Sequence, residues 1–488
     1  MPSSYKATIG LEIHAELKTK SKMFCGCKND PDEKRPNVNI CPVCMAHPGA
    51  LPVINKEAVK HVIKIGLSLG GDVSSFTEFD RKNYFYPDIP KGYQISQYKY
   101  PLVSGGSLNG VKITRVHLEE DTARSSHDRG DYSLIDFNRA GISLMELVTE
   151  PVIASASDAG AFARELQLLL RSLGAGDANM EKGEMRVEAN ISVLKDTKVR
   201  PSLYNEGRTF VGGGLGTKVE VKNINSFRAV EKAIGYEVKR QIETLEAGGK
   251  VVQETRGWDE DKEETFSQRL KESSHDYRYF PDPDLPKLDI GEIPEFSKEA
   301  LSKELPELPW EKRARYEKSG IKKEDADMYV RDAVFGRYID KVLEIFNDDK
   351  ESIAIASNFV STDIAGLHKS GIPVVSELTP EGFAEIIRMY INKEISSRGA
   401  KDIISIAGKE GGSPKEIADS RGLLQKSDEE WLISIAKKVM ENNKNAVSEY
   451  RAGKESSLKF LVGQGMKESG GSANPQILSA VFEKLLKN

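Results

Sequence analysis

The stretch Gly10-Leu-Glu-Ile-His-Ala-Glu-Leu17 alternates apolar and polar residues over its whole length. Successive side chains of a β-strand point to opposite faces, so the apolar residues share one face and Glu12, His14 and Glu16 share the other. Such a strand is typical of an antiparallel sheet with one buried face and one polar face. The stretch therefore predicts this kind of sheet, with two carboxylates and an imidazole close together on its polar face.

Further stretches carry polar faces of the same kind. Residues 111–121, 144–150, 185–193 and 218–222 each alternate as a strand does. Their polar side chains are Arg115, His117, Glu119 and Asp121, then Glu146 and Glu150, then Arg186, Glu188, Asn190 and Ser192, and finally Lys218, Glu220 and Lys222.

These polar faces could simply meet water, as they do on many antiparallel sheets. Glutamate and histidine dominate two of them, however, while lysine and arginine come from two others. Converging carboxylates and an imidazole are possible ligands for Mg²⁺, which takes few protein ligands together with substrate phosphates. Arg186 and Lys222 would hold phosphate oxygens. The pattern predicts an open, concave sheet that carries a metal and phosphate site.

The periodicity changes twice along the chain. Up to about residue 288 short alternating runs predict strands, interrupted by helices at residues 156–173 and 226–247. Proline- and glycine-rich breaks at residues 281–286 and 408–414 then separate two helical segments, the second of which ends in helices at 456–467 and 475–486. We therefore expect an α+β protein with a cradle domain at 1–290, a helical domain at 291–410 and a small all-helical tail at 411–488.

The composition is that of a soluble protein with several domains: 488 residues, 30% of them charged, with a net charge of −5. The N-terminus lacks the basic-then-apolar order of a signal peptide, and four prolines interrupt the charge-free residues 36–55. We expect a cytoplasmic protein with no membrane partner. Residues 411–488 hold 12 basic and 10 acidic side chains, the only positive balance among the three segments.

The four cysteines form two close pairs, Cys25-Gly-Cys27 and Cys41-Pro-Val-Cys44. Four thiolates at this spacing are typical of a tetrahedral zinc site whose ligands all come from the protein. Two disulfides are the alternative, which a reducing cytosol disfavours. The cluster predicts a structural zinc knuckle at residues 25–44.

Longer motifs follow one another along essentially the whole chain. Besides the opening stretch, they are Phe79-Asp-Arg-Lys-Asn-Tyr-Phe-Tyr-Pro87, Tyr93-Gln-Ile-Ser-Gln97, His117-Leu-Glu-Glu-Asp121, Glu188-Ala-Asn-Ile-Ser192, Lys222-Asn-Ile-Asn-Ser-Phe227, Asp276-Tyr-Arg-Tyr-Phe-Pro281, Phe460-Leu-Val-Gly-Gln464 and Ala473-Asn-Pro-Gln476. Together they resemble the B subunits of the tRNA-dependent amidotransferases, the GatB/GatE family.

The resemblance implies a ligase that forms carbon–nitrogen bonds with glutamine as the amide donor. Such a subunit would use ATP and Mg²⁺ to phosphorylate the side-chain carboxylate of Glu-tRNA(Gln), Asp-tRNA(Asn) or both. Ammonia channelled from an amidase A subunit would then give Gln-tRNA(Gln) or Asn-tRNA(Asn). A small C subunit completes the heterotrimer, and the synthetase that misacylates the tRNA is a further expected partner. The tail would be similar to YqeY, and we expect it to bind the body of the tRNA.

By position, the resemblance assigns Glu12, His14, Glu119 and Glu150 to the Mg²⁺ site. It also matches the four cysteines to the zinc-bearing members of the family. Lys222 is a further catalytic candidate, and the expected residues around the bound ATP are Glu120, Asp121, Glu146, Arg186, Glu188 and Asn190. Two other hypotheses remain: a non-catalytic tRNA-binding zinc module, which leaves the clustered glutamates and histidine unexplained, and a self-sufficient ATP-dependent ligase that uses free ammonia.

Overall fold

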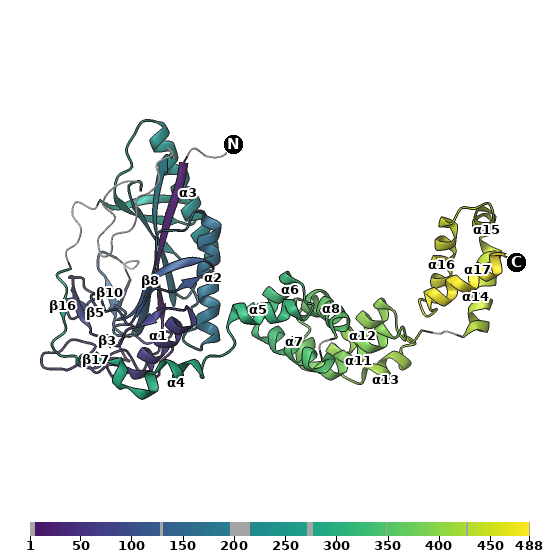
Figure 1. Cartoon of the computed structure of the whole chain (residues 1–488), viewed down its shortest axis with the longest axis horizontal. Helices are drawn as coiled ribbons and strands as arrows, with labels where there is room; N and C mark the ends of the chain where they lie inside the picture. Colours follow the sequence, from purple (N-terminus) through teal and green to yellow (C-terminus); the bar gives the residue numbers. More distant parts are fainter. Residues whose placement is uncertain are drawn as a thin grey trace. The chain divides into compact units, whose positions relative to one another are not determined.

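The computed structural model describes residues 5–126, 130–195, 215–270, 277–347, 349–425 and 428–487. Asp276, the first residue of one motif quoted above, lies outside them. The chain folds into two compact units, Met1–Pro309 and Trp310–Asn488, which are drawn in Figure 1. No described helix is long and apolar enough to cross a bilayer.

A ten-stranded sheet, counted over the described residues, forms the body of the first unit. Its order is β15-β14-β13-β12-β1-β11-β8-β6-β2, with β7 paired to β8, and every pair is antiparallel except β13 with β14. The strands are β1 (Tyr5–Glu16), β2 (Asp72–Val73), β6 (Val103–Ser104), β7 (Ser107–Leu108), β8 (Val111–Glu120), β11 (Ser143–Thr149), β12 (Met185–Lys195), β13 (Val219–Ile224), β14 (Glu254–Asp259) and β15 (Glu264–Leu270). The predicted α+β fold is confirmed.

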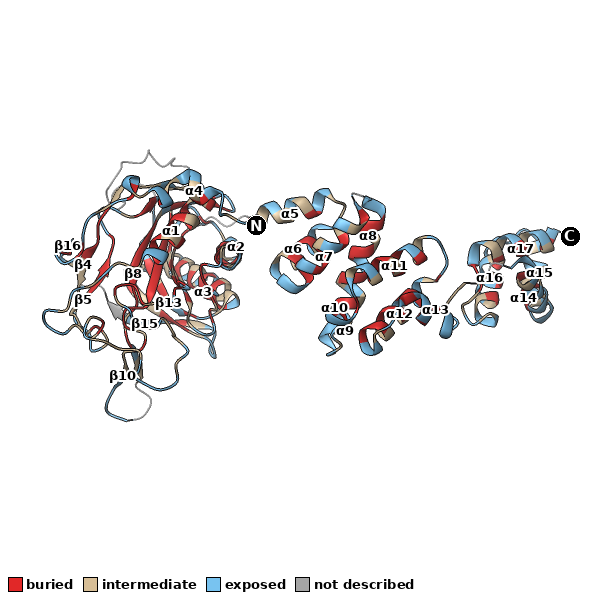
Figure 2. Cartoon of the chain, turned by 90° about the horizontal axis from the view of Figure 1, so that it is seen from below, coloured by how far each residue is buried: buried red, intermediate tan, exposed pale blue. Residues whose placement is uncertain are grey.

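Helices cover the apolar face of this sheet. α2 (Ala156–Ser172) and α3 (Phe227–Glu246) lie side by side along it, and α1 (Lys56–Ser68) packs against β8, β6 and β2 (Figures 1 and 2). Serine caps fix where α2 and α3 begin, because Ser155 and Ser226 each accept a hydrogen bond from a first-turn backbone N–H. The apolar residues of the opening stretch are almost fully buried, as the alternation predicts.

A small sheet lies on the opposite side of the large one (Figure 2). It consists of β16 (Phe280–Pro281), β4 (Asp80–Asn83) and β5 (Tyr93–Ser96). Ser96 of β5 donates a hydrogen bond of 3.3 Å to Glu119 of β8, so this sheet borders the polar face of the large one. The remaining short strands pair as β3 (Phe76–Thr77) with β17 (Leu288–Asp289) and β9 (Arg124–Ser126) with β10 (Leu134–Asp136).

The second unit is helical and has two separate hydrophobic cores, one within residues 316–418 and one within 432–486. Ile417 and Ala418 belong to the first core, so α13 packs with the helices that precede it. After α4 (Lys298–Ser302), the helices are α5 (Pro309–Lys318), α6 (Lys323–Arg331), α7 (Ala333–Phe346), α8 (Lys350–Phe359), the π-helix η3 (Val360–Ile364), α9 (Ala365–Lys369), α10 (Val374–Glu377), α11 (Pro380–Ile391), α12 (Ser397–Glu410), α13 (Pro414–Ser420), α14 (Glu429–Asn442), α15 (Lys444–Arg451), α16 (Ser456–Glu468) and α17 (Pro475–Lys487).

Candidate functional site

The register of the central strands aligns four polar residues across the large sheet. His14 on β1 lies opposite Arg186 on β12 and Glu146 on β11, and Glu146 lies opposite His117 on β8. Residues directly opposite one another on antiparallel strands project from the same face. Four segments far apart in the sequence therefore contribute to one row of side chains.

Five side chains on this face form what we call the acidic centre: Glu12, His14, His117, Glu119 and Glu146. The His14 Nε2 atom lies 3.3 Å from a carboxylate oxygen of Glu146, 3.4 Å from one of Glu119 and 3.8 Å from one of Glu12. The His117 Nε2 atom lies 3.6 Å from the same Glu146 oxygen. Two overlapping groups, Glu12 with His14 and Glu146, and His117 with Glu119 and Glu146, each bring three potential metal-ligand atoms within 4.8 Å of one another.

The acidic centre holds more negative charge than its own side chains can balance. Burial, with the nearby Glu146 charge, raises the pKa of Glu12 to about 7. Burial opposes the charge on His14, but the hydrogen bond to Glu146 and the Glu119 carboxylate outweigh it and raise the pKa of His14 to about 9. Burial, aided by Arg115, lowers the pKa of His117 to about 4. Burial opposes the charge on Glu146, but His117 and His14 outweigh it and hold the Glu146 pKa well below its usual range. A charged carboxylate that keeps a proton on His14 indicates a place suited to an added cation.

Cationic side chains border the acidic centre. Lys222 on β13 lies 2.8 Å from Glu188 and 3.8 Å from Glu220. Burial opposes its charge, but these carboxylates raise the pKa of Lys222 to about 12. Lys82 on β4 is also held charged, because Glu119 and Glu146 outweigh its burial and raise its pKa, and its ammonium lies 5.0 Å from the ring centre of Tyr277.

Sequence reasoning does not assign His117 or Lys82 to the site. His117 shares the polar face of residues 111–121, but alternation alone does not select it as a ligand. Lys82 lies within the quoted motif of residues 79–87, which gives no reason to single it out. The pairing of β8 with β11 reveals the role of His117, and the charge interactions of Lys82 with Glu119 and Glu146 reveal that of Lys82.

Two residues expected near the metal or the ATP lie apart from the acidic centre. Glu150 follows the last residue of β11, accepts a hydrogen bond of 2.7 Å from Thr114, and belongs to neither of the potential metal-binding groups among the described residues. Glu120 accepts hydrogen bonds from the Lys91 side chain at 2.6 Å and the Ile95 backbone at 3.0 Å. It therefore projects from the face of β8 opposite to that of Glu119.

Asn190 and Glu188 lie on the polar face of β12, beside Gly10 and Glu12 of β1. The Asn190 side-chain oxygen is buried and has no hydrogen-bond partner among the described residues. Because buried acceptors are normally satisfied, this oxygen is available to a donor on a bound molecule.

Asp121 belongs to a buried ion network next to the acidic centre. Arg139 contacts one Asp121 oxygen at 2.6 Å and also pairs with Glu16, while Arg186 contacts the other Asp121 oxygen at 2.7 Å. Burial opposes its charge, but the two guanidinium groups hold the pKa of Asp121 at about 2. Burial, with the Asp121 charge, raises the pKa of Glu16 to about 7. Both oxygens of the Asp121 carboxylate are thus paired with arginines.

Arg139→Leu is expected to destabilise the first unit by about 3–5 kcal/mol, because it leaves buried carboxylates without their partner. The Asp121 pKa lies below its unfolded value of 3.8, so the stability that its ion pairs contribute is present above that pH and is lost as the pH falls toward about 2. The difference in unfolding free energy between Arg139→Leu and the native chain, measured by urea unfolding of the full chain, should therefore shrink on acidification. Arg124→Leu, at an exposed position of β9, is the control and should change stability by less than about 0.5 kcal/mol.

The four cysteines come together as one cluster. All are free thiols, and their sulfur atoms lie within 4.8 Å of one another, with Cys41 and Cys44 Sγ 3.8 Å apart. A tetrahedral site with zinc–sulfur bonds of about 2.3 Å places its sulfur atoms about 3.8 Å apart. Hydrogen bonding from the Cys25 thiol outweighs burial and, with the Lys22 charge, lowers the pKa of Cys44 to about 5. The cluster could hold a metal ion.

The chain matches known proteins over nearly its whole length. Residues 7–293 match the family described as the GatB/GatE catalytic domain, and residues 338–486 match the GatB domain that includes the YqeY-like region. The chain is 42% identical to the B subunit of the aspartyl/glutamyl-tRNA(Asn/Gln) amidotransferase of Crocosphaera subtropica, over 99% of this chain and 98% of the relative. The corresponding B subunits of Persephonella marina and Thermus thermophilus are also 42% identical, over 99% of this chain and 100% and 99% of their own lengths.

Proposed function

The chain belongs to the GatB/GatE family, and from this premise we propose that it activates the side-chain carboxylate of Glu-tRNA(Gln), Asp-tRNA(Asn) or both for amidation. It would act as the B subunit of a complex with an amidase A subunit and a small C subunit, with glutamine as the source of ammonia. The observation that carries the proposal is the acidic centre, in which three strands bring three carboxylates and two imidazoles together.

The acidic centre fits Mg²⁺ through its carboxylates. Glu12, Glu119 and Glu146 offer hard oxygen ligands, which this ion prefers. His14 would join them as a nitrogen ligand after losing its proton, since a metal ligand must be deprotonated. The raised pKa of His14 supports this assignment, because the carboxylates of Glu146 and Glu119 that hold its proton would attract a metal cation in the same way. In this proposal Glu146 takes the place that the family resemblance gave to Glu150.

ATP with Mg²⁺ supplies the phosphoryl group that turns the substrate carboxylate into an electrophile for ammonia. The protein's part is to position groups and to neutralise charge, since phosphoryl transfer needs little covalent help. Lys222, which interacts with Glu12, and Lys82, which interacts with Glu119 and Glu146, would hold phosphate oxygens. Arg186 forms an ion pair with Asp121, and the Asn190 oxygen would accept a hydrogen bond from the nucleotide.

Hydrolysis of ATP in the assembled complex tests the proposed activity. Misacylated tRNA should stimulate it, whereas a non-catalytic tRNA-binding module would show no such stimulation. Glutamine-dependent amidation should require the A subunit, and a chain that performs it alone would instead be a self-sufficient ligase. Assays with both Glu-tRNA(Gln) and Asp-tRNA(Asn) would define the substrate.

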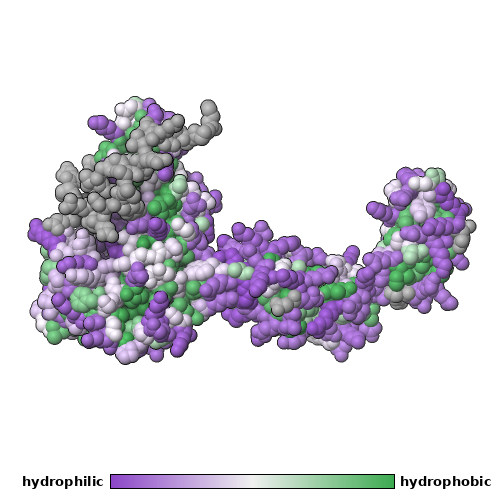
Figure 3. Space-filling model, in the orientation of Figure 1, coloured by the Kyte–Doolittle hydropathy of each residue, from purple (hydrophilic) through white to green (hydrophobic). Residues whose placement is uncertain are grey.

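The tail, expected at residues 411–488, has a hydrophobic core of its own within residues 432–486, and it is proposed to bind the body of the tRNA. Its exposed lysines include Lys437 and Lys459, and hydrophilic side chains cover most of the second unit on the face shown in Figure 3. Double-stranded RNA is recognised mainly by its shape and backbone. The alternative is a packing domain whose lysines only meet water.

Truncation after Gln425 is expected to raise the concentration of charged tRNA needed for half-maximal rate and to flatten the salt dependence of binding. The cut spares α13, which belongs to the preceding core. Binding of the A and C subunits and hydrolysis of glutamine should persist. Equal tRNA affinity of the truncated and complete complexes at two salt concentrations would favour the packing role.

A further inference from the structure

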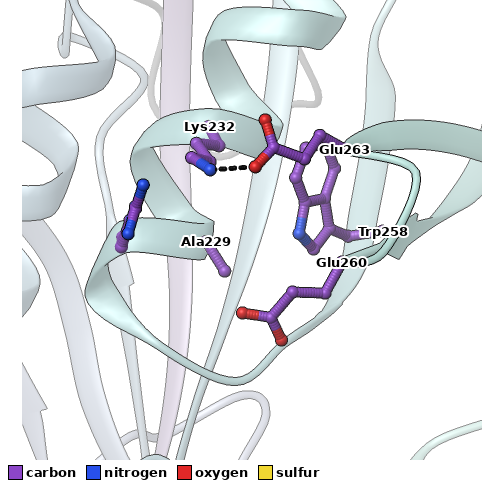
Figure 4. Close-up of a pocket in the computed structure, with 6 residues that line it drawn as sticks. Ala229, Lys232, Trp258, Glu260 and Glu263 are labelled. Atoms are coloured by element: carbon purple, nitrogen blue, oxygen red, sulfur yellow. Dashed lines mark hydrogen bonds and ion pairs between the residues drawn. The ribbon is translucent and has the colours of Figure 1, made fainter.

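A cavity lies in the first unit, between the start of α3 and the β14–β15 hairpin (Figure 4). It measures about 200 Å³ and involves none of the acidic-centre residues. Arg228, Ala229 and Lys232 line it from α3, and Trp258, Glu260 and Glu263 line it from the hairpin. Neither the proposed activation chemistry nor the tail uses this place.

The floor of the cavity presents a hydrogen-bond donor that lacks an acceptor. Trp258 is only 3% exposed, and its Nε1 atom has no hydrogen-bond partner among the described residues. Figure 4 shows the indole nitrogen directed into the space between Ala229 and Glu260. An indole N–H can only donate, and buried polar groups are normally satisfied. The missing partner must therefore bring an acceptor atom.

The charges around Trp258 favour a negatively charged acceptor. Arg228 and Ala229 belong to the first turn of α3, the positive end of a helix of 20 residues. Lys232 already holds one oxyanion, the exposed carboxylate of Glu263, which a ligand could displace. The two carboxylates, Glu260 and Glu263, are exposed on the hairpin, whereas the indole donor of Trp258 is buried. A cation would leave the indole unsatisfied and would face the positive helix end.

We propose that this cavity binds a phosphate group, which accepts from Trp258 Nε1 and pairs with Arg228 and Lys232. A phosphate carries several strong acceptor oxygens and suits both the indole donor and the two cations. It could be a free phosphate or a phosphodiester of an RNA backbone. Only the RNA source rests on the proposed function.

The indole N–H resonances of the full-length chain provide the test. Trp258, Trp310 and Trp431 are the three tryptophans of the sequence, and Trp258→Phe identifies the relevant resonance. Inorganic phosphate and a single-stranded RNA oligonucleotide are titrated separately, each against sodium chloride at matched ionic strength. We expect the Trp258 resonance to shift selectively. A shift with inorganic phosphate supports a free-phosphate source, and a shift with RNA alone supports a backbone phosphodiester.

Variants that change the charge of the cavity are expected to change its affinity for phosphate in opposite directions. Arg228→Gln and Lys232→Gln should each weaken binding by about tenfold, since each removes a charged hydrogen-bond donor. Glu263→Gln should tighten binding by up to about fivefold, because it removes the competing carboxylate. Lys239→Gln, an exposed position of the same helix outside the cavity, is the matched control and should change nothing. No shift with either probe, an equal shift with sodium chloride, or undiminished binding in Arg228→Gln would overturn the proposal.

Discussion

Glu146→Gln is expected to reduce amidation by at least about 10²–10³-fold, with either glutamine or free ammonia as the nitrogen source. Glu146 is the residue shared by both potential metal-binding groups, and it lies 3.3 Å from His14 and 3.6 Å from His117. The substitution preserves the shape of the side chain but removes the charge that would offset a divalent cation. Amidation of misacylated tRNA by the assembled complex measures the effect, and Glu119→Gln should behave alike.

Two comparisons sharpen this test. Hydrolysis of glutamine should continue in the Glu146→Gln complex, because we assign that reaction to the A subunit. Glu150→Gln should have a much smaller effect, because Glu150 is bonded to Thr114 outside both groups. A larger loss in Glu150→Gln than in Glu146→Gln would restore the assignment drawn from the family resemblance. Near-normal amidation by both Glu146→Gln and Glu119→Gln would show that the polar face only meets water.

Cys41→Ser is expected to remove a structural metal and with it the fold of residues 25–44. The native chain should contain one zinc ion, because the four sulfur atoms lie within 4.8 Å of one another and the Cys41–Cys44 pair has the 3.8 Å separation of a tetrahedral site. Structural zinc contributes about 10–16 kcal/mol of apparent binding free energy in small peptides, so its loss should lower solubility and complex assembly before it affects chemistry. Elemental analysis and gel filtration of the native and variant chains measure both effects.

A matched substitution separates loss of the metal from loss of the cysteine itself. Cys41→His supplies a nitrogen ligand that zinc accepts in place of sulfur, so it should retain the metal better than Cys41→Ser does. Native protein purified without chelators that contains no zinc would contradict the prediction. Equal solubility and assembly of Cys41→Ser and the native chain would show that the cluster is not structural.

The sequence by itself determined the local elements and the kinds of ligand. The alternation of residues 10–17 predicted β1 and its polar face, and the helices expected at residues 156–173 and 226–247 match α2 and α3 closely. The paired cysteines predicted one cluster, because two close pairs of thiols at this spacing are typical of a single zinc site. Each of these features depends on neighbours that are close in the sequence, which is why the sequence reveals it.

Tertiary structure alone decided which polar residues meet. Glu146 and Glu150 are both candidates by the period of two, and four residues of strand separate them by about 13 Å. Only the pairing of β11 with β1 and β8 places Glu146 between His14 and His117. Register depends on pairing between strands that are distant in the chain, and alternation along one strand carries no information about it. The same reason explains why Lys82, Arg139 and the unpaired indole of Trp258 became visible only in the folded chain.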